Sequence, residues 1–97
     1  MLEYPESLIV HLNRLLNSRA SPKSICPSEA ARALSPAELQ TSGVSSWRDL
    51  MPATRELAFE LRNQGRLEVL QKGRVLPVSQ TLEQTHGPIR LRKIVSH

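Results

Sequence analysis

Two segments in the first half of the chain repeat apolar residues with the spacing of a helix that packs on one side. The first predicts a helix over residues 5–18, because four leucines fall on one helical face. Those leucines are Leu8, Leu12, Leu15 and Leu16. The second predicts a helix over 27–35, where Pro27 suits the first turn and alanines provide a face for close packing. Residues 23–26 lie between them and can form a minor strand.

A third helix has the clearest pattern and is expected over 47–64. Its stripe consists of Trp47, Leu50, Met51, Thr54, Leu57, Ala58 and Leu61. Ser46 with Asp49 marks its start, and Gly65 marks its end. Because Pro52 lacks a backbone donor, we expect a kink or a short turn before the main helix.

After this helix the pattern changes to alternation of apolar and charged residues. Runs at 66–71 and 89–94 predict two half-buried strands that pair antiparallel, with a turn around Gly73. Residues 75–87 are expected to form the long, mobile part of this hairpin. Three helices followed by a small antiparallel sheet indicate an α+β fold, a winged helix-turn-helix with a two- or three-stranded wing.

One domain accounts for the whole chain, residues 1–97, because a chain of this length supports a single core. With one Trp, one Tyr and one Phe, that core is expected to be aliphatic, and aromatic platforms for stacking bases are scarce. The polar loop 40–46 is the predicted turn between the second and third helices. Ser35 and Glu38 form a capping-box pattern that allows a further short turn of helix before it.

The positive charge is confined to the second half of the chain. Residues 1–46 carry equal numbers of cations and acids, so the net charge of +4 arises entirely after residue 46. A segregated positive charge attracts phosphate backbones by releasing counterions. The alternative is a basic domain that has no nucleic-acid partner.

Seven cations are the candidate contacts for nucleic acid. Three arginines recur every seven residues on one side of the third helix, and none has an acid three or four residues away. Four more cations lie on the predicted wing. The full set is Arg48, Arg55, Arg62, Lys72, Arg74, Arg90 and Arg92. An ordinary solvated surface is the alternative for each, and Glu56 and Glu60 on the helix oppose a phosphate partner.

The sequence does not indicate an enzyme. The three histidines and the lone Cys26 are scattered, with no catalytic or metal-ligand spacing, so no cofactor or metal is expected. No apolar run approaches the length of a membrane span, and residues 1–7 lack the features of a signal peptide. We therefore expect a cytoplasmic protein without a membrane partner.

Four blocks of the chain resemble a known bacterial family. They are Ile25-Cys26-Pro27-Ser28-Glu29-Ala30-Ala31-Arg32-Ala33-Leu34, Trp47-Arg48-Asp49-Leu50-Met51-Pro52, Gln71-Lys72-Gly73-Arg74-Val75 and Gly87-Pro88-Ile89-Arg90-Leu91-Arg92. Together they are similar to DUF3253, a domain family of unknown function, over about residues 5–94. The resemblance implies a winged-helix architecture and no established activity.

The function expected from these patterns is non-enzymatic binding of duplex DNA. The third helix is expected to enter the major groove, and the turn from Lys72 to Arg74 to touch the backbone. The alternative is a protein-interaction module, which could bind another protein or form a homodimer. Convergence of the seven cations on one face favours DNA, whereas scattered cations and an exposed apolar patch favour a protein partner.

Overall fold

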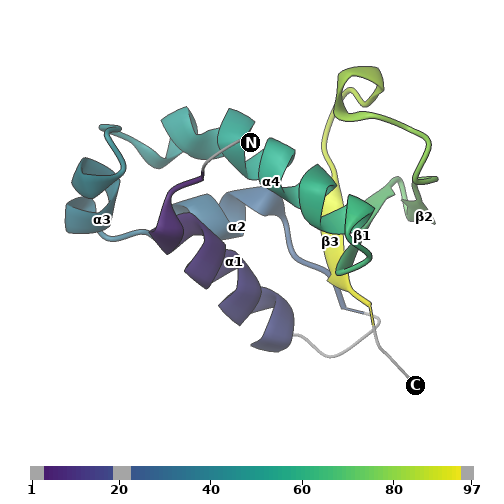
Figure 1. Cartoon of the computed structure of the whole chain (residues 1–97), viewed down its shortest axis with the longest axis horizontal. Helices are drawn as coiled ribbons and strands as arrows, with labels where there is room; N and C mark the ends of the chain where they lie inside the picture. Colours follow the sequence, from purple (N-terminus) through teal and green to yellow (C-terminus); the bar gives the residue numbers. More distant parts are fainter. Residues whose placement is uncertain (1–3, 19–22, 95–97) are drawn as a thin grey trace.

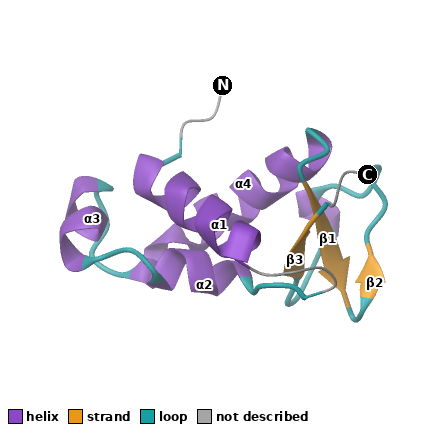
Figure 2. Ribbon diagram, turned by 90° about the horizontal axis from the view of Figure 1, so that it is seen from below, coloured by secondary structure: helices purple, strands orange, loops and turns teal. Residues whose placement is uncertain are grey.

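The computed structural model describes residues 4–18 and 23–94 of the chain. In chain order, the helices before the sheet are α1 (Glu6–Ser18), α2 (Pro27–Arg32), α3 (Pro36–Thr41), the 3₁₀ turn η1 (Trp47–Leu50) and α4 (Met51–Asn63). They are followed by β1 (Leu67–Gln71), β2 (Arg74–Val75), the 3₁₀ turn η2 (Leu82–Gln84) and β3 (Arg90–Lys93). The sheet lies at one end of the molecule and α3 at the other (Figures 1 and 2).

The three strands form an antiparallel sheet in the order β2-β1-β3. Val69 of β1 pairs with Leu91 of β3, as the alternating pattern predicts. The extended segment before α2 adds a bridge at the outer edge of β3, where the N–H groups of Ile25 and Leu91 each donate to the other residue's carbonyl at 2.8 Å. The predicted α+β class, with a winged-helix type of architecture, is confirmed.

One helix ends earlier than the sequence predicts, and the short turn predicted before the third helix is present. The second predicted helix stops at Arg32, and a separate helix, α3, begins at the capping box of Ser35 and Glu38. Glu38 N–H donates to Ser35 Oγ at 3.1 Å, and Ser35 N–H donates to Glu38 Oε1 at 2.9 Å. The third predicted helix starts with η1, and α4 follows with Pro52 in its first turn, where no intrahelical donor is needed.

The core lies where α1, α2 and α4 meet the inner face of the sheet. Its largest fully buried apolar side chains are Leu8, Leu12, Ile25, Leu67, Val69 and Leu91. Thr54 is the polar member of the α4 stripe and is also fully buried. Its hydroxyl donates to the carbonyl of Leu50 one turn earlier at 2.7 Å, which satisfies the only polar group that this side chain buries.

A two-residue turn connects β1 to β2 and forms the tip of the wing. Lys72 has φ 52° and Gly73 has φ 79°, and positive values at both central positions define the type I′ turn that suits the twist of a hairpin. Gly73 accepts this conformation without strain, whereas Lys72 pays a modest steric cost. The turn therefore fixes where the Lys72 side chain leaves the backbone.

Candidate nucleic-acid interface

Arg62 lies inside the protein, although its spacing predicted a contact with nucleic acid. Only 5% of the residue is exposed. Its guanidinium donates to the carbonyls of Gln80 at 2.7 Å and Val78 at 3.1 Å, and to Asn63 Oδ1 at 2.9 Å. It also stacks on the buried ring of Phe59, 4.6 Å from the centroid, and burial lowers the pKa of Arg62. Arg62 therefore anchors the segment 77–80 to α4.

Arg55 is turned toward the same connecting segment. It is half-buried, and its guanidinium donates to the carbonyl of Gly87 at 3.3 Å, with the carbonyl of Thr85 at 3.5 Å. The segment from β2 to β3 thus returns along the arginine side of α4. Hydrogen bonds from Arg62 and Arg55 tether this segment, the long part of the predicted wing, to the helix near both of its ends.

Arg48 is the only exposed member of the three helix arginines. It precedes α4, in η1, where its guanidinium carbon lies 4.7 Å from the centroid of the Trp47 ring. The seven-residue spacing places the three arginines on one side of the helix. The segment between β2 and β3 binds Arg55 and Arg62, whereas Arg48 remains exposed. The predicted basic face of the third helix is therefore not one continuous exposed surface.

Two cations of the wing, Lys72 and Arg90, line one groove, and Arg74 follows Lys72 and Gly73 in the chain. Lys72 and Arg74 are exposed at the tip of the hairpin, and Arg90 is exposed on β3. Arg90 is oriented by Ser24, because its Nε donates to Ser24 Oγ at 2.6 Å and its Nη2 to the Ser24 carbonyl at 2.8 Å. A groove of about 630 Å³ lies between Lys72 and Arg90. Its lining is Ser24, Leu70, Gln71, Lys72, Gly73, His86, Gly87, Pro88 and Arg90.

Arg92 is held in an ion pair across the sheet. Its Nε and Nη2 atoms lie 3.1 and 2.9 Å from Glu68 Oε1, and the two residues are cross-strand partners in the β1–β3 register. The paired carboxylate offsets much of the attraction that Arg92 exerts on a phosphate. Arg92 therefore contributes less to a basic surface than the other wing cations.

The outward surface of α4 is acidic rather than basic. Glu56 is exposed, and Glu60 accepts a hydrogen bond from the hydroxyl of Tyr4 at 3.0 Å. Burial and this hydrogen bond raise the pKa of Tyr4 to about 12. Glu56, Glu60 and Glu83 line a groove of about 560 Å³ between α4 and η2. Because carboxylates repel phosphates, this surface is poorly suited to entering a DNA groove.

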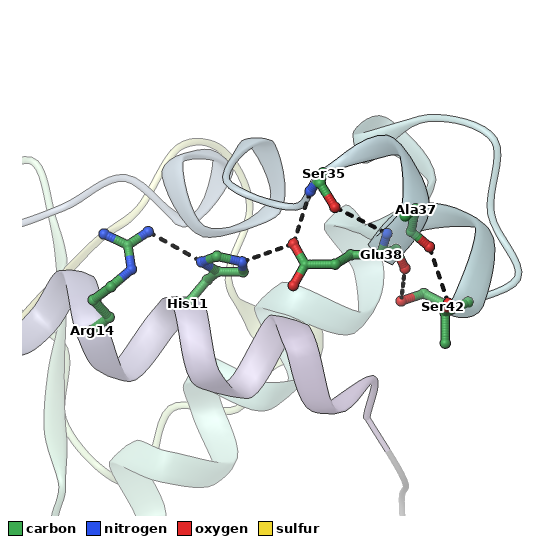
Figure 3. A network of polar contacts seen from close by, with 7 residues as sticks. His11, Arg14, Ser35, Ala37, Glu38 and Ser42 are labelled. Carbon is green, nitrogen blue, oxygen red and sulfur yellow. Dashed lines mark hydrogen bonds and ion pairs between the residues drawn. The ribbon is translucent and has the colours of Figure 1, made fainter.

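A polar network that the sequence analysis missed joins α1 to α3 (Figure 3). Because an arginine side chain can only donate, the Arg14 Nη2 group donates to His11 Nδ1 at 3.1 Å. In the neutral ring the proton is then on His11 Nε2, which donates to Glu38 Oε1 at 3.0 Å. The hydrogen bond from the Ser35 backbone, followed by the one from His11, lowers the pKa of Glu38 to about 2. The capping box predicted the first of these bonds, whereas no sequence signal links His11 to a residue 27 positions away.

Other chemistry-bearing residues have structural partners. Both ring nitrogens of His11 are engaged, and Cys26 Sγ accepts from the Ser28 hydroxyl at 3.2 Å. Within residues 4–18 and 23–94, no three His, Cys, Asp or Glu side chains gather as they would around a metal ion. None of the helices in these ranges is long and apolar enough to cross a membrane.

Comparison with curated proteins finds no match for this chain. A family model does match, over residues 5–94, and it covers every element from α1 to β3. The four resembling blocks all lie within this range. The chain belongs to the family described as Protein of unknown function (DUF3253).

Proposed function

We propose that the protein binds duplex DNA without catalysis, chiefly through its wing. The observation that carries this proposal is the pair of exposed cations Lys72 and Arg90 that line one groove, with the exposed Arg74 next to the turn at its edge. None of the three makes an ion pair within the described residues, so their charges are available to a partner. Lys72 lies within the tight turn and Arg74 follows it, and such a turn can approach a phosphate backbone closely.

The proposed contacts read the backbone rather than the bases. Arg55 and Arg62 are occupied by backbone carbonyls, and the exposed side of α4 carries Glu56. A helix presented in this way offers few donors to base edges in the major groove. Phosphate contacts position a protein on DNA without specifying sequence, so we expect weak sequence preference and strong salt dependence. A DNA partner also fits the predicted cytoplasmic location.

The test is the salt dependence of binding to a random-sequence duplex between about 50 and 200 mM salt. Replacing Lys72 and Arg74 by glutamine should lower the slope of log K against log salt by up to about two units, if each cation meets one phosphate. A matched control replaces Arg14 and Arg66, two exposed arginines outside the groove, and removes the same charge. The control should keep the wild-type slope to within a few tenths of a unit.

An NMR titration of the labelled protein with the same duplex locates the contact. Salt-sensitive shifts at residues 70–75 and 86–92 are expected, with little change at residues 56–63. An identical slope in the Lys72 and Arg74 variant excludes the wing contact. Silence of all amides at low salt excludes DNA binding altogether, because electrostatic attraction is strongest there.

A second candidate function is binding of a cationic protein segment, favoured by the groove between α4 and η2. Its lining combines the apolar side chains of Phe59 and Leu82 with Glu56 and Glu83, and the neighbouring Val78 is 66% exposed. Shifts at residues 56–63 and 78–83 on adding a lysine-rich peptide, reduced in an E56Q/E83Q variant, would support this function. Equal shifts in that variant and the wild type would exclude the groove.

A further inference from the structure

Two arginines from separate elements stack on the only tryptophan of the chain. The guanidinium carbon of Arg32, at the end of α2, lies 4.5 Å from the centroid of the Trp47 ring, and that of Arg48 lies 4.7 Å from it. The two carbons are therefore at most about 9 Å apart. Cation–π attraction holds each guanidinium against the indole. Two positive charges that repel each other are thereby kept close together.

The two guanidinium groups are available to an external partner. Both arginines are exposed, and neither side chain makes a hydrogen bond or ion pair with another residue in the described part of the chain. The adjacent Asp49 accepts from the Ser45 hydroxyl at 3.4 Å, and Glu29 accepts from the Cys26 backbone at 2.7 Å. Each guanidinium keeps five N–H donors in a planar fork that matches phosphate oxygens.

We propose that Arg32 and Arg48, positioned by Trp47, form a second site for the DNA phosphate backbone. This inference rests on the proposed function and extends it to the opposite end of α4. Figure 1 shows η1 and the wing at the two ends of that helix. The 13 residues of α4 span roughly 20 Å at 1.5 Å per residue. Because a duplex carries a phosphate charge about every 1.7 Å along its axis, one duplex can offer phosphates to two sites this far apart without α4 entering a groove.

An incoming phosphate relieves the repulsion between the two guanidinium groups, and it binds a site whose side chains are already ordered. Trp47 reports on this directly, because a guanidinium that turns toward a phosphate changes the surroundings of the indole. It is the only tryptophan, so the fluorescence signal comes from this site alone. Binding confined to the wing leaves that signal unchanged.

The experiment measures Trp47 fluorescence and duplex affinity across salt concentration in four proteins. These are the wild type, R32Q/R48Q, K72Q/R74Q and the charge-matched control R14Q/R66Q. We expect saturable, salt-sensitive fluorescence changes in the wild type, and a slope lower by one to two units in R32Q/R48Q. R32K/R48K keeps the positive charge but loses the planar guanidinium fork. It should recover part of the slope, which shows that the loss in R32Q/R48Q comes from the charge and not from a weakened fold. Thermal unfolding of each variant confirms that it is folded.

The outcomes separate the two proposals. If DNA binds, K72Q/R74Q binds more weakly, and R32Q/R48Q matches the R14Q/R66Q control, then the second site is wrong and the wing proposal stands. If DNA binds with no change in Trp47 fluorescence, the second site is likewise wrong. If the wild type binds no duplex at low salt, the proposed function fails and the second site fails with it.

Discussion

Replacing Arg62 by methionine tests whether this arginine is a structural anchor or a ligand contact. Methionine keeps an unbranched stem over Phe59 but removes every guanidinium donor. The carbonyls of Val78 and Gln80 then lose their donor, and the segment between β2 and β3 loses its main tether to α4. We expect the variant to lose stability while the wing keeps its exposed cations.

The magnitude follows from the two short hydrogen bonds. Hydrogen bonds from a charged donor contribute about 1.5–3 kcal/mol each. Two such bonds give a gross loss of about 3–6 kcal/mol. Two effects reduce this loss: water can hydrogen-bond to the carbonyl of the exposed Val78, and the variant no longer has to bury a charged side chain. We therefore expect a net loss of about 2–3 kcal/mol in the free energy of unfolding. In a domain of this size the melting temperature should fall by roughly 10–20 °C.

Urea and thermal unfolding of R62M and wild type measure this loss, with R66M as the control. Arg66 is an exposed arginine four residues further along the chain, so its replacement should change stability by less than about 0.5 kcal/mol. Hydrogen exchange should show faster opening of residues 78–88 in R62M alone. If R62M instead keeps its full stability and loses duplex affinity, Arg62 contacts phosphate and the anchoring argument is refuted.

Two further predictions concern pH. Hydrogen bonds from Ser35 and His11 lower the pKa of Glu38 from 4.5 to about 2, so the folded state binds fewer protons than the unfolded state. The stability that Glu38 contributes is therefore fully present above pH 4.5 and should be lost as the pH falls toward 2. Unfolding measured across this range should show a flatter dependence in E38Q, and an unchanged dependence would contradict the assignment. The pKa of Tyr4 is raised from 10.0 to about 12 by burial and Glu60, so stability present below pH 10 should be lost as pH rises toward 12. Ultraviolet titration of this single tyrosine should give a midpoint well above 10, and a midpoint near 10 would refute the burial.

The sequence predicted the fold well because local signals agree with the tertiary structure. The apolar stripe of α4, its proline entry and its stop at Gly65 all come from neighbouring residues, and the structure has a helix of 13 residues there. The capping box at Ser35 likewise accounts for α3, the further short helix that the sequence allows, while α2 ends at Arg32 and not at residue 35. At residues 33–35 the apolar pattern of the second helix overlaps with the capping box of the next one, and the capping box determines where the new helix begins.

The candidate site was less predictable, because spacing along a helix does not show what covers it. Arg48, Arg55 and Arg62 do share a side of the helix by periodicity. The segment from 76 to 89 that covers two of them has no repeating pattern, and its contacts use backbone carbonyls, which every sequence possesses. The stack of Arg32 on Trp47 and the link between His11 and Glu38 join residues distant in sequence, and only the folded chain brings them together.

The bridge between Ile25 and Leu91 has a consequence for the order in which the protein can fold. β3 is the last strand along the described chain, yet it lies between β1 and the Ile25 segment. During synthesis the helices and β1 emerge first, and the inner side chains Leu67 and Val69 then lack the strand that pairs beside them. Closure of the sheet must wait for residues 90–93. A ribosome stalled before that point should hold a helical, incompletely packed nascent chain with an open sheet edge.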